Sequence, residues 1–240
     1  MSLLLVTHGT RNRAGQRTFA AIRDAVAARV PDRRVHLAHV DVQTPLVADA
    51  VQQWAGVEPL TVIPVFLGSG YHVHVDIPAA TTGRPVAVTE PLGPEPELIE
   101  ALAQRWLQTD SDDREERPVT ELVLGATGSS DPRSLAQTRR VADLLAERLE
   151  LPVTAAFCAA GDPEYGEVVR ERLQAGVRFG VVSHLVAPGY FHRKLVKVAA
   201  AGPIPVSAPI GPHPALIDLL LRRADEAGRD SGPGAGTLAA

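Results

Sequence analysis

PLGPEPELIEALAQR, at residues 91–105, returns as PIGPHPALIDLLLRR at residues 209–223, and eight of the fifteen positions are identical. The match reveals a repeat with a separation of 118 residues. Two further pairs of segments have a separation of 119, namely LLLVTHGTR (3–11) with LVLGATGSS (122–130), and VIPVFLGSGY (62–71) with VVSHLVAPGY (181–190). Similarity at a fixed period indicates a repeated structural unit, so we interpret the chain as two copies of one unit.

In both copies, short apolar runs alternate with segments of helical period. The predicted strands are Leu3–Thr7, Arg34–Val40, Leu60–Phe66 and Pro85–Thr89, then Glu121–Gly125, Val153–Phe157, Phe179–His184 and Pro205–Ser207. The predicted helices are Gly15–Arg29, Pro45–Trp54, Asp76–Thr81 and Glu95–Gln108, then 133–149, 163–175, 193–200 and 214–227. This alternation favours right-handed crossovers and parallel sheets covered on both faces. We therefore predict an α/β fold with two similar four-stranded parallel-sheet domains, flavodoxin-like in strand order, that face each other across a cleft.

A charged run marks the boundary between the two copies. The sequence TDSDDREERP, at Thr109–Pro118, has no apolar face to bury, which predicts an exposed linker. We expect an N-terminal domain carrying the active site at residues 1–111 and a degenerate C-terminal repeat at residues 119–227. Residues 228–240 are rich in Gly, Ala and Ser and are predicted to form a flexible tail.

The composition argues against several classes of protein. A net charge of −4 gives no indication of the basic face that binding of nucleic acid would need. The single cysteine, Cys158, cannot by itself build an iron–sulfur cluster or a Cys-based zinc site, and it fits a reducing compartment. The apolar run Met1–Thr7 is too short for a membrane span and has no basic region before it. We expect a cytoplasmic protein with no membrane partner.

Polar side chains follow three predicted strands of the first copy. His8 follows the first strand, Asp41 the second, and His72 and His74 stand in the turn after the third. In parallel sheets, ligands bind outside the carboxyl ends of neighbouring strands, where strand order reverses. Imidazole and carboxylate suit divalent cobalt, iron, nickel or zinc, and imidazole also accepts protons near neutral pH. The pattern predicts a divalent-metal site and gives no sign of an organic cofactor.

The turn THGTR (7–11) and the stretch GYHVHVDIP (70–78) resemble the sirohydrochlorin chelatase family, and the likeness runs through both halves. The resemblance implies a chelatase-like fold and insertion of Co²⁺ or Fe²⁺ into sirohydrochlorin, an acidic tetrapyrrole, in cobalamin or siroheme biosynthesis. Ni²⁺ or Zn²⁺ would serve in vitro. It implies that His8 and His72 are catalytic and bind the metal, together with Asp41, where the family usually has glutamate. The expected substrate contacts are Arg11, Ser69, Gly70, Tyr71, His74, Phe191 and Arg193.

The second copy lacks the predicted metal ligands. The positions of His8, Asp41 and His72 are taken by Thr127, Ala159 and Phe191. We therefore expect one site per chain and a non-catalytic second half that closes the cleft. The family that this chain resembles includes single-copy members that pair as symmetric dimers. This chain therefore resembles two such copies fused into one, and we expect a monomer to be sufficient for function. His184 is expected to be a buried, hydrogen-bonded histidine of the second sheet.

Other functions remain open from the sequence. A non-catalytic metal or tetrapyrrole carrier would need the same ligands without turnover. A chelatase for another porphyrin would differ in whether its substrate is acidic or lipophilic. A histidine phosphatase is disfavoured, because Thr7 stands where that class has an arginine before its histidine.

Overall fold

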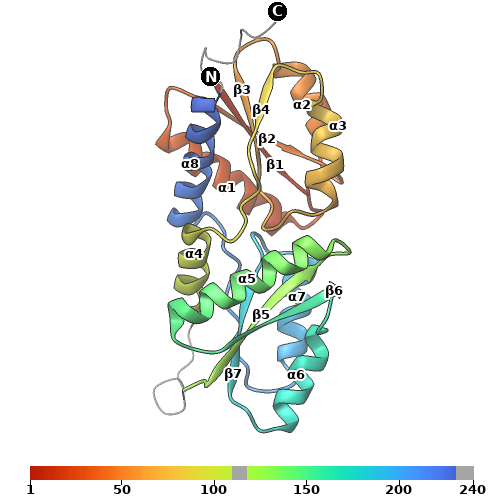
Figure 1. The fold of residues 1–240 in the computed structure, drawn as a ribbon, viewed down its shortest axis with the longest axis vertical. Helices are drawn as coiled ribbons and strands as arrows, with labels where there is room; N and C mark the ends of the chain where they lie inside the picture. The colour runs from red at the N-terminus through yellow and green to blue at the C-terminus, as the bar shows by residue number, and fades with distance from the viewer. Residues whose placement is uncertain (110–117, 231–240) are drawn as a thin grey trace, which may run out of the picture.

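The computed structural model describes residues 1–109 and 118–230, and it has two parallel sheets placed end to end along the molecule (Figure 1). The chain runs β1 (Ser2–Thr7), α1 (Arg13–Arg29), β2 (Arg34–His39), α2 (Val47–Trp54), β3 (Leu60–Pro64), η1 (His72–Asp76), α3 (Ile77–Thr81), β4 (Val86–Val88), α4 (Pro96–Leu107), β5 (Glu121–Gly128), α5 (Pro132–Leu149), β6 (Val153–Ala160), α6 (Tyr165–Gln174), β7 (Phe179–His184), α7 (Tyr190–Ala199) and α8 (Pro214–Asp230). The predicted α/β class with two parallel-sheet units is confirmed. Residues 110–117 of the predicted linker and residues 231–240 of the predicted tail lie outside the described residues, whereas residues 228–230, predicted to belong to the tail, form the end of α8.

The first sheet has the strand order β2-β1-β3-β4, and all its pairs are parallel. β1 lies between β2 and β3, so Thr7 is paired with His39 and Val6 with Pro64. Every residue of β1 is buried, because helices cover both faces of the sheet. This order brings the turns after β1 and β3 to the same edge.

The second sheet has three strands, in the order β6-β5-β7, where the sequence predicted four. The predicted fourth strand, Pro205–Ser207, forms only an isolated bridge between Val206 and Val181. Pro205 has no N–H to donate, and the N–H of Ser183 bonds to the hydroxyl of Ser207 at 2.9 Å instead of to a backbone carbonyl. Side-chain hydrogen bonds therefore end the ladder after one bridge.

The last helix of each repeat, α4 in the first and α8 in the second, packs on the sheet of the other repeat. In Figure 1, α8 lies beside the first sheet, and α4 lies at the end of the second. α8 packs on α1 and β3, whereas α4 packs on α5 and β7. A Cβ atom added at Gly180 of β7 would lie 2.0 Å from the ring of Trp106 in α4, so only glycine allows this approach. Each sheet is completed by a helix from the other repeat.

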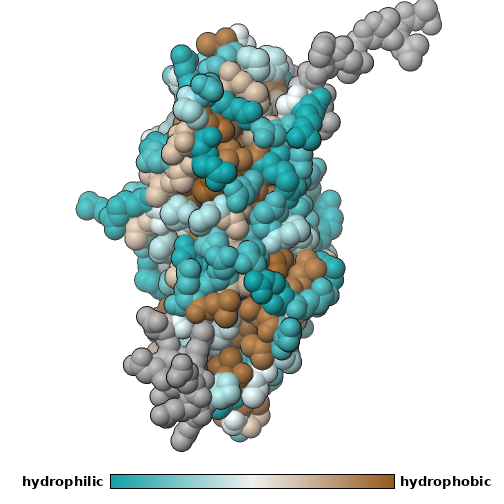
Figure 2. Space-filling model, turned by 90° about the vertical axis from the view of Figure 1, so that its left-hand side faces the viewer, coloured by the Kyte–Doolittle hydropathy of each residue, from teal (hydrophilic) through white to brown (hydrophobic). Residues whose placement is uncertain are grey.

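Ion pairs hold the exchanged helices to each other. Arg222 of α8 pairs with Glu95 and Glu97 at 2.7 Å each, and Arg223 pairs with Glu95 at 2.6 Å. The Nε and Nη2 atoms of Arg105 both donate to the carbonyl of Ile210. Figure 2 shows this side of the molecule, where hydrophilic side chains cover much of the middle of the surface. The two repeats are therefore joined by polar contacts as well as by packing.

One hydrophobic cluster continues through both halves. It includes Leu5 and Ile63 of the first sheet, Leu124 and Val182 of the second, and Trp106 between them. Two smaller clusters lie under α2 and α3 and under α6 and α7. The division at residues 1–111 and 119–227 stays a prediction about the repeats. In the packed structure, the core around each sheet includes the last helix of the other repeat. This exchange of helices fixes the position of the two halves on either side of the space between them.

Candidate functional site

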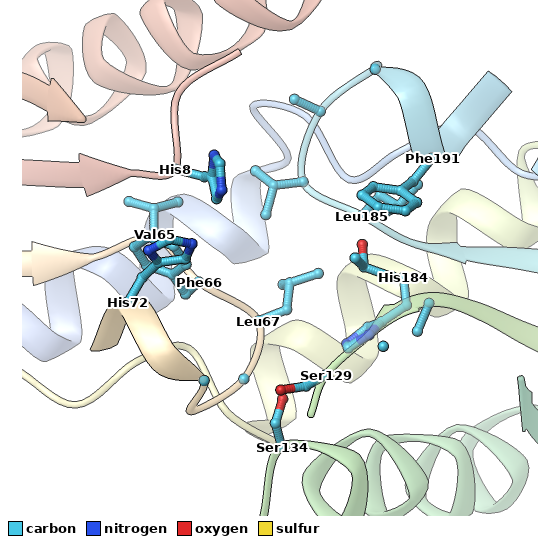
Figure 3. Close-up of a pocket in the computed structure, with 18 of the residues that line it drawn as sticks. His8, Val65, Phe66, Leu67, His72, Ser129, Ser134, His184, Leu185 and Phe191 are labelled. Carbon is cyan, nitrogen blue, oxygen red and sulfur yellow. The ribbon is translucent and has the colours of Figure 1, made fainter. Parts of the chain in front are cut away.

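A cavity of about 700 Å³ lies between the carboxyl ends of the strands of the two sheets. The first half contributes His8, Val65 and His72 to its wall, and the second contributes His184 and Phe191. Figure 3 shows the two groups on opposite sides of the space. The volume falls within the range of pockets that enclose small molecules and cofactors.

His8 and His72 meet on the first wall. Their ring centroids are 4.6 Å apart and the ring planes are at 88°, an edge-to-face arrangement. His8 comes from the turn after β1, where Gly9 has φ of +91° and a Cβ atom would lie 2.0 Å from the carbonyl of Asp41. The histidine is therefore held at the strand end by a turn that requires glycine directly after it.

A hydrogen bond orients the ring of His72. Nδ1 of His72 lies 2.5 Å from Oδ2 of Asp76, and a carboxylate only accepts, so Nδ1 carries the proton. The two residues are the ends of η1, a π-helical turn, and such turns are frequent at functional sites. Asp76 was not among the site residues predicted from the sequence. The spacing HVHVD could have found it, because residues four apart lie on one side of a helical turn.

The structure does not bring Asp41 into a shared site with the two histidines. Among residues 1–109 and 118–230, no three His, Cys, Asp or Glu side chains are grouped so that they could hold a metal. Asp41 is exposed, and its Oδ1 accepts the N–H of Val42 at 2.7 Å. Its own N–H donates to the carbonyl of His8. In this structure it braces the His8 turn, and its role as a metal ligand stays a prediction.

The predicted substrate contacts divide into two groups. Gly70, Tyr71 and Phe191 line the cavity. The others lie outside its lining: Ser69 and His74 bond to each other at 2.8 Å, Arg11 is exposed, and Arg193 lines a neighbouring hollow over α7. The N–H of Ser69 also donates to Oε1 of Gln137 at 2.8 Å, which ties the first half to the second beside the cavity.

The second wall carries polar groups that were not predicted from the sequence as site residues. His184, His192, Ser129 and Ser134 all line the cavity. The expectation for His184 was half right. It is buried, with 5% of its surface exposed, but its Nε2 has no hydrogen-bond partner among the described residues. Burial lowers the pKa of His184 to about 4, so the ring is neutral at physiological pH. The offset of 119 residues between the repeats places His184 at the position of Val65. This replacement of an apolar residue by histidine was a signal in the sequence that could have identified His184.

Within the part of the chain that the structure describes, no helix is both long and apolar enough to span a membrane.

Comparisons with known proteins agree with this architecture. The CbiX family model matches twice, at residues 2–109 and 121–227. The chain is 26% identical to the sirohydrochlorin ferrochelatase of Bacillus subtilis (strain 168), over 96% of this chain and 93% of that protein. It is 28% identical to the sirohydrochlorin cobaltochelatase of Methanothermobacter thermautotrophicus, over 44% of this chain and 90% of the shorter protein. The structure of SirB from Bacillus subtilis with Fe³⁺ matches with a TM-score of 0.74 and 25% identity, over 97% of both chains.

The two matches of the family model coincide with the two repeats, and the Bacillus relatives align over nearly the whole chain. The resemblance found in the sequence is thereby confirmed, and this chain belongs to the CbiX family, with the family's unit present twice.

Proposed function

We propose that this protein is a sirohydrochlorin chelatase, which inserts Co²⁺ or Fe²⁺ into sirohydrochlorin for cobalamin or siroheme biosynthesis. The observation that carries the proposal is the pair His8 and His72, whose rings meet 4.6 Å apart at the wall of a cavity of about 700 Å³. Relatives that align over most of their own length carry the names of iron and cobalt chelatases of this tetrapyrrole. We place the reaction in the cytoplasm, since an acidic tetrapyrrole needs no membrane to reach the site.

Both histidines offer a ring nitrogen to the metal, which is a substrate here. Nδ1 of His72 donates to Asp76, and Nδ1 of His8 lies 3.2 Å from the carbonyl of Gly9. Each contact keeps the proton on Nδ1 and leaves the Nε2 lone pair free for a cation. Two protein ligands leave further coordination positions to water, and the tetrapyrrole nitrogens can replace those waters in turn.

Insertion also requires that two pyrrole nitrogens lose their protons. We assign proton acceptance to His72, because the carboxylate of Asp76 would stabilise the imidazolium that forms after the metal has moved to the ring. His8 is exposed and has no carboxylate partner comparable to Asp76 among the described residues, so its role here is to bind the metal. Asp41 then has a supporting role, bracing the turn that carries His8 through its backbone N–H.

The two walls have different tasks in this proposal. The second copy has Thr127 and Phe191 where the first has His8 and His72, so it supplies no equivalent ligand pair. The Phe191 ring borders the cavity and offers an apolar surface to the tetrapyrrole plane. Both walls belong to one chain, so a monomer forms the complete cleft.

Turnover under anaerobic conditions tests the proposal. Sirohydrochlorin is mixed with Co²⁺ or Fe²⁺, and the change in its visible spectrum is followed with and without the protein. We expect catalysed insertion with at least one of the two metals. Binding of both metal and tetrapyrrole without acceleration would instead indicate a carrier. Preference for an uncharged porphyrin would indicate a different chelatase.

A further inference from the structure

His184 is the buried group of the cavity that the proposed mechanism does not use. It ends β7 and is 5% exposed, and its ring borders the cavity across from His8 and His72 (Figure 3). Its Nε2 has no hydrogen-bond partner among the described residues. A buried polar atom without a partner destabilises a fold, so such an atom in a native protein needs an explanation.

The repeat shows that the fold itself does not require a histidine here. Val65 occupies the same position in the first copy, is buried at 4% exposure, and packs in the hydrophobic cluster that runs through both halves. In one half of the molecule, an apolar side chain therefore packs well at this strand end. The second half has a polar ring at the same place, facing the cavity.

The neighbouring histidine behaves differently. His192 also lines the cavity, but it is only partly buried, and its ring interacts with the backbone of Ser207. His36 has a buried Nε2 without a partner as well, yet it is outside the cavity lining and stacks on Trp54 at 4.2 Å. His184 alone of these three combines an unpartnered nitrogen with a position on the cavity wall.

Donor groups gather on the same wall. The hydroxyl of Ser129 accepts the N–H of Asp131 at 3.0 Å, which leaves its own proton free to donate. Ser129 precedes α5 and Ser134 lies in its first turn, and both line the cavity. α5 is an 18-residue helix, and the N-terminal end of a helix favours negative charge. Asp131 at that end is paired with Arg133 at 2.8 Å, so its own charge is balanced.

We propose that His184 and Ser129 form a carboxylate-binding subsite, in which the imidazole N–H of His184 donates to an acid side chain of the tetrapyrrole. The inference rests on the proposed function, since it takes its ligand from that reaction. A neutral imidazole binds a carboxylate through a charge-assisted hydrogen bond without adding a buried charge of its own. The subsite would hold the tetrapyrrole from the side opposite the metal, with its ring against Phe191 and its nitrogens towards His8 and His72.

Binding of metal-free sirohydrochlorin to the full chain tests the subsite, followed by the fluorescence of the tetrapyrrole. His184→Val copies the first repeat and removes the donor, and His184→Gln restores one. His36→Val makes the same chemical change away from the cavity. We expect His184→Val to weaken binding about tenfold, His184→Gln to recover most of the loss, and His36→Val to have no effect. Cobalt affinity should be unchanged in all three variants, because His8 and His72 are untouched.

A second ligand isolates the carboxylate. For sirohydrochlorin with its acid groups converted to methyl esters, the wild type and His184→Val should bind equally, because the charge that His184 recognises is gone. Equal binding of the free acid by wild type and His184→Val would overturn the subsite while leaving the proposed function intact. An equal loss for acid and ester would overturn the carboxylate assignment. If the wild type binds no sirohydrochlorin, the proposed function fails, and the subsite fails with it.

Discussion

The Nδ1 atom of His72 lies 2.5 Å from Oδ2 of Asp76, and the two residues begin and end the same π-helical turn. This turn follows β3 and joins directly to α3, so the carboxylate is fixed by the fold and sets the orientation of the imidazole. A carboxylate on the far nitrogen of a metal-binding histidine fixes the tautomer and raises the basicity of the ligand. Metal binding and proton acceptance at His72 therefore both depend on Asp76.

Asp76→Asn should lower the rate of metal insertion by about 10- to 100-fold, because an amide can stabilise the wrong tautomer of His72. The thermal midpoint should change little, since Asp76 is partly exposed. Steady-state insertion and thermal unfolding of the same sample give the two values. A rate within twofold of the wild type would remove Asp76 from the site.

Gly180→Ala should destabilise the protein by about 1–3 kcal/mol, because a Cβ atom would lie 2.0 Å from the ring of Trp106. Trp106→Leu makes room for the added methyl group, so the double variant should lose less than the sum of the two single changes. Urea unfolding of the four proteins measures this coupling. Additive losses would mean that α4 does not pack on β7, contrary to the exchange of helices.

The pH dependence of stability should reveal the buried His184. Burial lowers its pKa to about 4 from an unfolded value of 6.5. Between these pH values the unfolded chain binds the extra proton, so the free energy of unfolding falls as the pH drops from 6.5 towards 4. The loss between pH 7 and pH 5 should be about 2 kcal/mol from this residue.

His184→Val removes that contribution, so its stability should fall less on acidification than that of the wild type. The carboxyl group of Glu97 affects stability only at lower pH. The guanidinium of Arg222 lowers the pKa of Glu97, so the stability that this pair contributes is lost only below about pH 4.5. Denaturant unfolding at pH 7 and pH 5 compares the two proteins. Parallel losses in wild type and variant would show that His184 is already protonated in the folded state.

Much of the fold was predictable from the repeat and from local patterns. The eight strand candidates gave seven strands, and Phe179–His184 was predicted with its observed bounds. The exchange of α4 and α8 was not predictable, because both helices carry the same apolar pattern from the same repeated motif, and either would fit either sheet. The eighth strand does not form because the hydroxyl of Ser207 accepts a hydrogen bond from the backbone N–H of Ser183. A pattern of apolar residues cannot reveal such a bond.

The part of the candidate site that follows the ends of neighbouring strands was predictable from the sequence. Parallel pairing of β1 with β3 brings the turns of His8 and His72 to one edge, so strand order alone placed them together. Asp76 was missed because the prediction treated its segment as a short ordinary helix and weighed no π-helical turn. His184 was assigned a structural role, since a sequence cannot show that a buried nitrogen lacks a partner.

The turn after β1 should tolerate no side chain at Gly9. Gly9→Ala would place a methyl group against the Asp41 carbonyl at a residue with φ of +91°, so the turn must shift and carry His8 with it. Insertion should fall at least tenfold. Gly56→Ala is the matched control, because Gly56 also has positive φ but its Cβ position is open and far along the chain from the site. Equal activities of the two variants would mean that the His8 turn does not position a ligand.

Titration of the full chain with Co²⁺, followed by its visible absorption, tests the central claim that one histidine pair per chain holds the metal to be inserted. We expect one tight site per 240-residue chain. The site should be absent in His8→Ala and in His72→Ala and unchanged in Thr127→Ala, the matching position of the second repeat. Insertion into sirohydrochlorin should be lost in the same two variants and kept in the third. Two equivalent tight sites, or a tight site that survives both histidine changes, would contradict it.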